Sequence, residues 1–433
     1  MEVRPGYKRT EVGDIPEDWA TNSILRISRQ IMDYRGRTPK KLGMEWGSGD
    51  IQALSAGNVK MGFVDFNAEC YVGSEALYNR WMTRGDIAKD DILFTTEAPL
   101  GNVALVPDDR KYILSQRTVL LQIDQEQASS GFIYQLMLSD GFQRMLVDYS
   151  SGSTAKGIQR KRFEQLCVVL PPLPEQRAIA AALSDVDALL AGLDRLIAKK
   201  RDLKQAAMQQ LLTGQTRLPG FQGEWEVKRL GEHVRFLKNG VNSRAELTAI
   251  GAIKYLHYGD IHASGGVTLD PSELPSIPLA RARTLDRLMV GDLIFVDASE
   301  DLDGVGKSVE IVGAADTQVV AGLHTIAARF DAAVLADGFK AYLQFCPPFR
   351  RHLQRLAAGT KVYATSRGHL ATAEMLLPST DEQTAIATVI SDMDAELTAL
   401  EARRDKTRAL KQAMMQELLT GRTRLLPVGG AHA

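Results

Sequence analysis

The chain repeats itself. Residues 175–218 can be laid over residues 382–425 at a shift of 207, and 26 of the 44 aligned positions are identical. The same shift holds upstream without a gap and pairs Arg160 with Arg367. A period of this length constrains the architecture before any helix or strand is assigned. The sequence therefore predicts two copies of one unit, each a globular part followed by a segment of about 44 residues.

Each 44-residue segment is predicted to be a long helix. Neither segment contains proline, and each ends at Leu-Leu-Thr-Gly, where Gly214 and Gly421 suit a C-cap. Apolar residues step by four and three, which is the spacing of a coiled-coil seam. We expect the two helices to pair within the chain through Ile179, Leu183, Val186, Leu190, Leu193 and Ile197 of the first, and Ile386, Ile390, Met393, Leu397 and Leu400 of the second.

The globular parts are predicted to be mixed α/β or α+β units. Residues 132–147 predict a helix interrupted at Asp140-Gly141. Short apolar runs rich in β-branched residues predict strands in both copies. In the first copy these are residues 92–95, 103–106, 118–123 and 167–170, and in the second copy residues 293–296, 308–312, 325–330 and 375–377.

Composition excludes several classes of protein. Lys and Arg total 52 against 53 Asp and Glu, so no global field draws the chain to nucleic acid or anionic lipid, and any anion site must be local. No apolar run approaches the roughly 18 residues of a membrane helix, and the first 14 residues are polar, so we expect a soluble, cytoplasmic protein. Three widely spaced cysteines, Cys70, Cys167 and Cys346, argue against disulfides and CxxC metal pairs.

Two motifs suggest enzymes but fail on chemistry. Gly306-Lys307-Ser308 lacks the earlier glycine of a phosphate-binding loop, with Asp301 in its place, and is better explained as a turn between strands. Cys346-Pro-Pro-Phe349 lacks the Asn, Asp or Ser with which an amino-methyltransferase would hold its base, and the repeat marks it as a turn between helices. No HExxH or GxSxG pattern is present. We therefore expect no catalytic, cofactor-binding or metal-binding residues.

Local positive charge does occur, at the same place in both copies. Residues 149–163, the first basic window, contain no acid and four Lys or Arg, and residues 338–373, the second basic window, contain no acid and six. Lys and Arg supply phosphate contacts, while Arg, Gln and Ser can read base edges, so the pattern predicts duplex DNA as a ligand. The predicted DNA-binding residues are Lys156, Gln159, Arg160, Lys161, Arg162, Lys361, Tyr363, Ser366, Arg367 and His369.

The chain resembles the specificity subunits of type I restriction-modification systems. The resemblance rests on the stretch from Pro171 to Arg177, PPLPEQR, on the duplicated Leu-Lys-Gln-Ala and Leu-Leu-Thr-Gly, and on the opening GDIPEDW from Gly13 to Trp19. In the second copy, Ser-Thr-Asp-Glu-Gln from Ser379 to Gln383 replaces the full proline-rich form.

The resemblance implies an α+β fold with two target-recognition domains, at residues 1–172 and 217–379. Two long antiparallel helices at 173–216 and 380–426 would separate them in an internal pseudo-two-fold repeat, with a tail at 427–433. Each domain would read one half of a split DNA target. The helices would bind two modification (methyltransferase) subunits, and restriction (motor-nuclease) subunits would join the assembly.

Two other classes remain open from the residues alone. One is a fused modification protein that methylates DNA itself, which the missing glycine-rich loop for S-adenosylmethionine disfavours. The other is a coiled-coil scaffold with duplicated protein-binding domains and no role on DNA, for which any retention on DNA would be salt-sensitive without sequence dependence.

Overall fold

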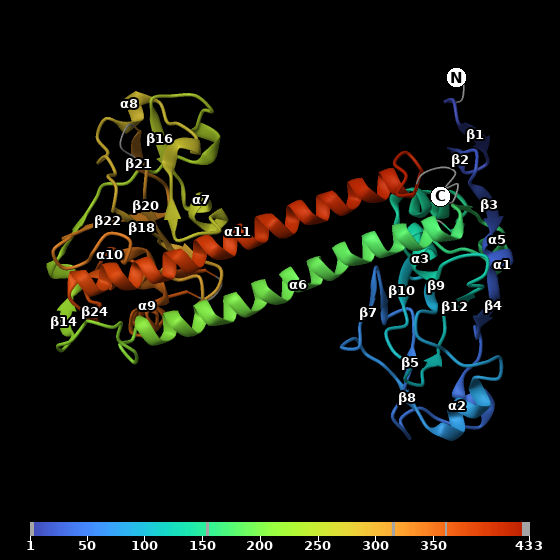
Figure 1. The fold of residues 1–433 in the computed structure, drawn as a ribbon. Helices are drawn as coiled ribbons and strands as arrows, with labels where there is room; N and C mark the ends of the chain where they lie inside the picture. The colour runs from blue at the N-terminus through green and yellow to red at the C-terminus, as the bar shows by residue number, and fades with distance from the viewer. Residues whose placement is uncertain (1–3, 153–155, 314–316, 360–361, 427–433) are drawn as a thin grey trace. The chain divides into compact units, whose positions relative to one another are not determined.

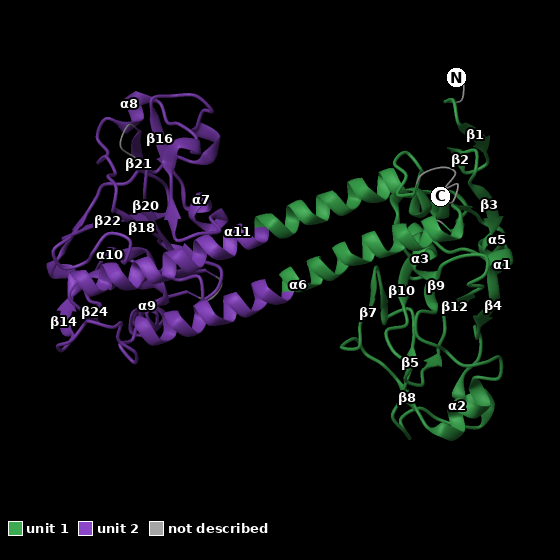
Figure 2. Ribbon diagram, in the orientation of Figure 1, with its two compact units in different colours: residues 1–194, 402–433 green, residues 195–401 purple. Residues whose placement is uncertain are grey.

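The computed structural model describes residues 4–152, 156–313, 317–359 and 362–426. Its contacts divide the chain into two compact units, residues 1–194 with 402–433 and residues 195–401 (Figure 2). Both boundaries fall inside long helices, α6 (Leu173–Leu211) and α11 (Thr380–Leu418), which are drawn in green and red in Figure 1. Each unit is therefore one globular part together with part of both helices.

The first unit is built on an antiparallel sheet in the order β10-β9-β12-β4. Every residue of the two central strands is buried, as expected for apolar runs covered on both faces. Helices and the start of α6 supply one side of the core. The bounds are β4 (Ser28–Asp33), β9 (Ile92–Thr96), β10 (Leu100–Leu105), β12 (Thr118–Ile123), α1 (Ile24–Ile27), α3 (Ser130–Leu138), α4 (Asp140–Asp148) and α5 (Arg160–Gln165).

Shorter elements complete the first unit. A three-stranded sheet in the order β11-β5-β8 forms a second core around Trp81, and three two-stranded pairs, β1 with β2, β3 with β13 and β6 with β7, lie outside the main sheet. The bounds are β1 (Tyr7–Thr10), β2 (Gly13–Pro16), β3 (Ala20–Ser23), β5 (Ile51–Leu54), β6 (Val59–Lys60), β7 (Phe63–Val64), β8 (Val72–Gly73), β11 (Ile113–Leu114), β13 (Cys167–Leu170), α2 (Glu75–Trp81) and the 3-10 turn η1 (Pro39–Leu42).

The second unit repeats this plan. Its main sheet has the order β15-β22-β18-β20-β17, in which the first four strands correspond in order to β4, β12, β9 and β10. Strand β14 pairs with β24 as β3 pairs with β13. The sheet strands are β15 (Val234–Phe236), β17 (Thr268–Leu269), β18 (Leu293–Val296), β20 (Ser308–Ile311) and β22 (Thr325–Phe330), and the ribbon strands are β14 (Glu226–Arg229) and β24 (Glu374–Leu377).

The remaining elements of the second unit are short. Strands β16 (Ile253–Leu256) and β21 (Gln318–Ala321) run parallel, and β19 (Ala298–Ser299) pairs with β23 (Tyr363–Ala364). The helices are α7 (Tyr258–Ala263), α8 (Leu279–Ala282), α9 (Pro347–Leu356) and α10 (Arg367–Ala371), and the 3-10 turns are η2 (Leu230–Glu232), η3 (Arg244–Glu246), η4 (Pro271–Glu273) and η5 (Lys340–Phe345).

The predicted fold class, mixed helix and strand, is confirmed, and all eight predicted strands are present, four with the predicted bounds and four with ends that differ by at most three residues. The helix break differs by one residue from the prediction. Ser139, not Asp140-Gly141, interrupts the helix, because the Ser139 hydroxyl accepts from the backbone N–H of Phe142 at 3.2 Å and caps α4. The predicted turn between helices at Cys346-Pro-Pro-Phe349 is confined to Cys346, which separates η5 from α9, because α9 already begins at Pro347.

The two long helices have the same length, 39 residues each. Past the last helical residue the chain turns at Gly214 and Gly421, both with φ of +71°. Each glycine also lies close to other side chains, since a β-carbon would lie 3.3 Å from the Trp225 ring at Gly214, and 2.4 Å from Pro16 and 3.1 Å from the Trp19 ring at Gly421. A glycine is needed there for both conformation and space.

Ion pairs join the helices inside each unit and show that they run antiparallel. In the first unit Asp187 of α6 pairs with Lys411 of α11 at 2.7 Å. In the second unit Lys200 pairs with Glu396 at 2.7 Å, and Lys204 pairs with Asp394. The residue number falls along α11 as it rises along α6, which is the antiparallel order.

The predicted seam residues have different surroundings. Ile179 and Leu183 of α6 are buried in the globular core of the first unit, and Ile386 and Ile390 of α11 in that of the second. Leu193, Ile197 and Leu397 are also buried, whereas Val186, Leu190, Met393 and Leu400 are half-buried. The ends of the seam therefore anchor the helices to the globular parts rather than to each other alone.

The end of each long helix is built into the globular part of the other repeat. Leu418 and Leu419, at the end of α11, lie in the core of the first unit with Trp19 and Ile179. Leu211 and Leu212, at the end of α6, lie in the core of the second unit. The Leu-Leu of each Leu-Leu-Thr-Gly stretch is therefore a pair of core side chains.

A buried glutamate and an arginine fix each of these helix ends. Glu175, near the start of α6, accepts two hydrogen bonds of 2.7 Å from Arg424, which follows α11. Glu382, near the start of α11, accepts two of 2.5 Å from Arg217, which follows α6. Each guanidinium also lies over a tryptophan ring, Arg424 over Trp19 and Arg217 over Trp225. We call each set the helix clamp of its unit.

The glutamine that follows each clamp glutamate binds the globular part. Gln176 donates to the carbonyl of Pro171 at 2.8 Å and accepts from the N–H of Ser129 at 2.9 Å. Gln383 donates to Pro378 and accepts from Ala336, each at 2.9 Å. The repeated Glu-Gln pair therefore connects the start of one helix to the end of the other and to the core.

Replacing Arg424 by alanine should lower the free energy of unfolding of the full chain by about 3–5 kcal/mol, because it leaves the buried carboxylate of Glu175 without its bidentate partner. Arg422→Ala is the matched control, since Arg422 is 63% exposed and its ion pair with Glu417 spans 4.0 Å, so its loss should cost less than about 1 kcal/mol. Urea unfolding measures both. Equal effects of the two changes would contradict the clamp.

Candidate nucleic-acid interface

The first basic window begins with a small hairpin at the end of β9. Ser151 and Gly157 bridge each other, and Gly157 also bridges Glu97. The N–H of Ile158 donates to the carbonyl of Thr96 at 3.0 Å. The window is thereby held at the end of β9, with Lys156 exposed beside it.

The second basic window is held in the same way in its own unit. Ala358 and Ala364 bridge each other, and β23 pairs with β19, which follows β18. The N–H of Thr365 donates to the carbonyl of Asp297 at 2.8 Å. At the shift of 207, Ala358 and Ala364 correspond to Ser151 and Gly157 of the first window.

The arginine that begins the next helix has an equivalent partner in each unit. Arg160, at the start of α5, donates to the carbonyl of Ile31 at 3.1 Å and pairs with Glu164 at 2.6 Å. Arg367, at the start of α10, donates to the carbonyl of Leu237 at 2.7 Å and to Asn239 Oδ1 at 3.0 Å. Both guanidinium groups therefore hold the helix against the end of a sheet strand.

The structure separates the predicted DNA-binding residues of the first window into two groups. Arg160 contacts its own unit, as described above. Lys156, Gln159, Lys161 and Arg162 are exposed, and their side chains make no hydrogen bond or ion pair with any described residue. These four are free to contact a ligand.

In the second window two of the five predicted residues, Ser366 and Arg367, have side-chain partners in their own unit. The Ser366 hydroxyl caps α10 by accepting from the N–H of His369 at 3.2 Å. Tyr363 is half-buried in β23, and the Nδ1 atom of His369 is buried with no hydrogen-bond partner in the part of the chain that is described. Lys361 lies outside the described residues. Their proposed role in DNA binding stays a prediction.

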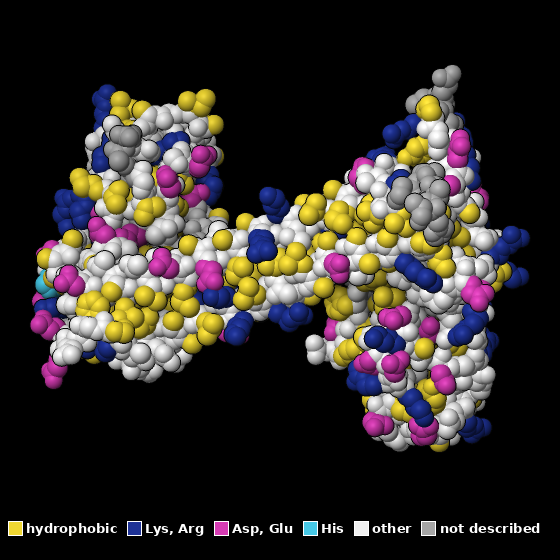
Figure 3. Space-filling view, in the orientation of Figure 1, with side chains coloured by type: hydrophobic (Ala, Val, Ile, Leu, Met, Phe, Trp, Pro, Cys, Tyr) yellow, Lys and Arg dark blue, Asp and Glu magenta, His cyan; other side chains and the backbone are white. Residues whose placement is uncertain are grey.

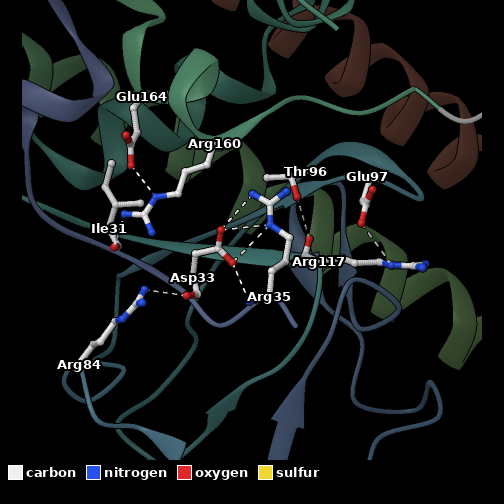
Figure 4. A network of polar contacts seen from close by, with 9 residues as sticks. All are labelled: Ile31, Asp33, Arg35, Arg84, Thr96, Glu97, Arg117, Arg160 and Glu164. Carbon is white, nitrogen blue, oxygen red and sulfur yellow. Dashed lines mark hydrogen bonds and ion pairs between the residues drawn. The ribbon is translucent and has the colours of Figure 1, made fainter. Parts of the chain in front are cut away.

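The structure also brings together arginines that the sequence analysis missed. Figure 4 shows Arg35, Arg84, Arg117 and Arg160 around the end of β4, interleaved with three acids. Arg35 pairs with Asp33 at 3.0 Å, and Arg84 donates to the Asp33 carbonyl at 2.8 Å. Arg37 and Arg84 both lie about 5.5 Å from the centre of the Tyr34 ring.

A search for acid-free windows could not find this arginine group. Asp33 and Asp86 lie within two residues of Arg35 and Arg84 in the sequence, so the local net charge cancels. The run from Tyr34 to Arg37, in which an aromatic and a glycine alternate with two arginines, was the available signal. Arg84, which contacts Asp33 and Tyr34, lies about 50 residues later in the sequence.

Four described residues other than glycine have a positive φ, namely Asp90, Ala98, Arg117 and His324, and the last two occupy equivalent positions in the two units. Arg117 and His324 directly precede the central strands β12 and β22, and their φ angles are +65° and +56°. The left-handed conformation costs a residue with a β-carbon about 1–2 kcal/mol. Arg117 pairs with Glu97 at 3.4 Å, and His324 Nδ1 pairs with Asp297 at 3.1 Å. Arg117 and His324 correspond at the shift of 207.

The first unit also contains a cleft of about 1180 Å³ on its helix side. Met145, Tyr149, Met415 and Leu419 line its apolar part, and Arg144, Asp187, Arg408 and Lys411 supply charge. Only Tyr149 belongs to the first basic window. No group of three or more potential metal ligands occurs among the described residues, and none of the described helices is long and apolar enough to cross a membrane.

A family model, related sequences and solved structures all point to the same family of proteins. Residues 16–199 match the family described as type I restriction modification DNA specificity domain. The MjaVIII specificity subunit, a type I restriction enzyme subunit of Methanocaldococcus jannaschii, is 24% identical over 423 residues, which cover 95% of this chain and 94% of that protein.

Solved structures show the same fold. A chain from a study of complex assembly and conformational transition of the type I R-M system aligns with a TM-score of 0.57 and 19% identity, covering 94% of this chain and 99% of that one. The S subunit of a type I restriction-modification system from M. genitalium aligns with a TM-score of 0.57 and 14% identity, covering 96% and 98%.

The two kinds of basic residue in the first window should respond differently to mutation. The double change of Lys161 and Arg162 to alanine should flatten the salt dependence of DNA binding by about two units of log-log slope, with unchanged thermal stability. Arg160→Ala should instead lower the free energy of unfolding by about 1–2 kcal/mol, because the Ile31 carbonyl and Glu164 lose a charged partner. An unchanged slope in the double variant would mean that these side chains contact only solvent.

Proposed function

The chain belongs with the specificity subunits of type I restriction-modification systems, and from this premise we propose that each of its two units reads one half of a bipartite DNA target. The observation that supports the proposal most strongly is the duplicated hairpin at the end of β9 and of β18. Both hairpins are held by the same backbone contacts, while their exposed side chains differ.

Two half-sites of different sequence require different side chains at equivalent positions of the same backbone. Backbone contacts and buried strands set the position of each hairpin, whereas side chains at its surface decide which base edges can be contacted. Lys156 and Gln159 of the first unit correspond to Tyr363 and Ser366 of the second. The two half-sites should therefore differ in sequence.

The long helices are proposed to bind two modification subunits, with restriction subunits joining the assembly. Leu196 and Leu203 lie seven residues apart on α6 in the second unit and are 39% and 47% exposed. In Figure 3 hydrophobic side chains lie among charged ones along the exposed faces of the long helices. A helix face with this composition suits a protein partner. The cleft of the first unit adds a second such surface.

The chain itself is proposed to be non-catalytic, a reader and scaffold that leaves methyl transfer to adenine, and cleavage, to its partners. Two alternatives, a fused DNA methyltransferase and a scaffold without DNA, make different predictions. A methyltransferase would bind S-adenosylmethionine in the absence of partners. A scaffold would retain DNA only through charge, with no preference among sequences.

Exchanging residues 1–172 for the corresponding domain of another specificity subunit should change one half of the methylated motif and leave the other half intact, because the second unit keeps its own hairpin. The motif can be read by sequencing that detects methylated adenine in DNA from cells that also express the modification subunit. The reciprocal exchange of residues 217–379 is the control and should change only the other half. Changes in both halves after either exchange would refute independent reading.

A further inference from the structure

We propose that Arg117 and His324 are specificity-determining residues, each contacting a base edge in the half-site read by its own unit. The inference rests on the proposed function, because it names the residues through which the two units read DNA. It comes from one geometry that occurs in both units at positions that correspond at the shift of 207.

In the first unit, Arg117 is fixed by its backbone and by one acid. The N–H of Thr96 donates to the Arg117 carbonyl at 3.2 Å, which ties the residue to the end of β9. The Arg117 Nε atom pairs with Glu97 Oε1 at 3.4 Å (Figure 4). The Arg117 side chain is 56% exposed. Its terminal amino groups make no hydrogen bond to any described residue.

In the second unit, His324 has the same backbone contact and an equivalent acid. The N–H of Asp297 donates to the His324 carbonyl at 3.2 Å, and the two side chains pair at 3.1 Å. The imidazole is 52% exposed. The Tyr258 ring stands perpendicular to it at 5.5 Å and limits its orientations. Arg117 and His324 are therefore different side chains that are held by the same backbone contact and by an equivalent acid.

The fold itself does not call for a large side chain at either position. At φ near +60° glycine is the residue of least cost, and other residues held in this conformation are concentrated at functional sites. Neither side chain contributes to a hydrophobic core. The acid beside each one fixes its direction without burying it. Both features suit a side chain that contacts a ligand outside the protein.

The two residues lie next to the basic windows. Glu97, the partner of Arg117, is bridged to Gly157, which follows the exposed Lys156. Asp297, the partner of His324, accepts through its carbonyl from the N–H of Thr365 in the second window. If Lys156 contacts the DNA phosphates, the neighbouring Arg117 side chain would lie at the groove, where base edges are accessible. The guanidinium fork of Arg117 matches the O6 and N7 acceptors of guanine, and an imidazole offers one donor and one acceptor.

The test uses the full chain with its modification subunit and reads the methylated motif by adenine-methylation sequencing. Arg117→Ala should reduce discrimination at one base pair of one half-site by roughly 5- to 150-fold, which is the discrimination that a good bidentate contact provides. His324→Ala should relax one position of the other half-site only. Arg110→Ala is the matched control, because Arg110 is also exposed and paired with a nearby acid, Asp108, and it should leave the motif unchanged.

A second variant separates reading from folding. Arg117→Gly removes the side chain but suits the left-handed backbone, so it should be at least as thermally stable as the wild type and should relax the motif as Arg117→Ala does. For any variant that no longer supports methylation, selection of bound duplexes from a random library gives the same readout. A motif identical to the wild type in both Arg117 variants and in His324→Ala would overturn the inference.

The failure of this inference can be distinguished from failure of the proposed function. If the wild-type chain directs methylation to a bipartite motif and the variants leave that motif unchanged, other residues read the bases and only the present inference is wrong. If the wild-type chain directs no sequence-restricted methylation, the proposed function is wrong as well. Relaxation of both half-sites by Arg117→Ala would also overturn the inference, because each residue is assigned to one unit.

Discussion

The organisation of the chain depends on a buried carboxylate at the start of each long helix. A carboxylate that is almost fully buried must be paired, because the cost of removing it from water exceeds most single favourable interactions. Glu175 and Glu382 obtain their partners from Arg424 and Arg217, which follow the end of the opposite helix. Neither compact unit is complete without the helix end contributed by the other repeat.

This exchange explains why the repeated motifs have their composition. The Leu-Leu pair supplies core volume, the glycine allows the turn against a tryptophan, and the arginine neutralises the glutamate. None of these residues is among the predicted DNA-binding residues. The motifs that identify the family therefore stabilise the scaffold, whereas the residues proposed to read DNA lie on hairpins and strand ends that the scaffold positions. Within one chain, the scaffold contacts are the same in both units and the surface side chains differ.

Much of the fold could be predicted because the sequence carries two copies of each signal. Strands β9, β12, β18 and β22 are continuous apolar runs, and the long helices have an uninterrupted seam. Strands such as β5, β8, β16 and β21 were missed, because they are short and pair with segments far along the chain, so their stability comes from tertiary packing. The helix clamps could not be predicted either, because their residues are far apart in the sequence; Glu175 and Arg424 are separated by 249 residues.

The candidate site was only partly predictable. Charge counting located both basic windows. It could not show that Arg160 and Arg367 donate hydrogen bonds to backbone carbonyls of their own unit. It also missed Arg35 and Arg84, whose charge is cancelled by neighbouring acids in the sequence. No sequence motif marks Arg117 and His324, because the backbone angle and the neighbouring acid that distinguish them both come from the fold.

The central claim, that one chain carries two separate DNA-reading units, is tested most directly by the set of sites methylated when the wild-type chain is expressed with a modification subunit. Sequencing that detects methylated adenine gives these sites across a genome. The account predicts one motif with two specified parts separated by base pairs of any sequence. A single uninterrupted motif, or methylation with no shared motif, would contradict it.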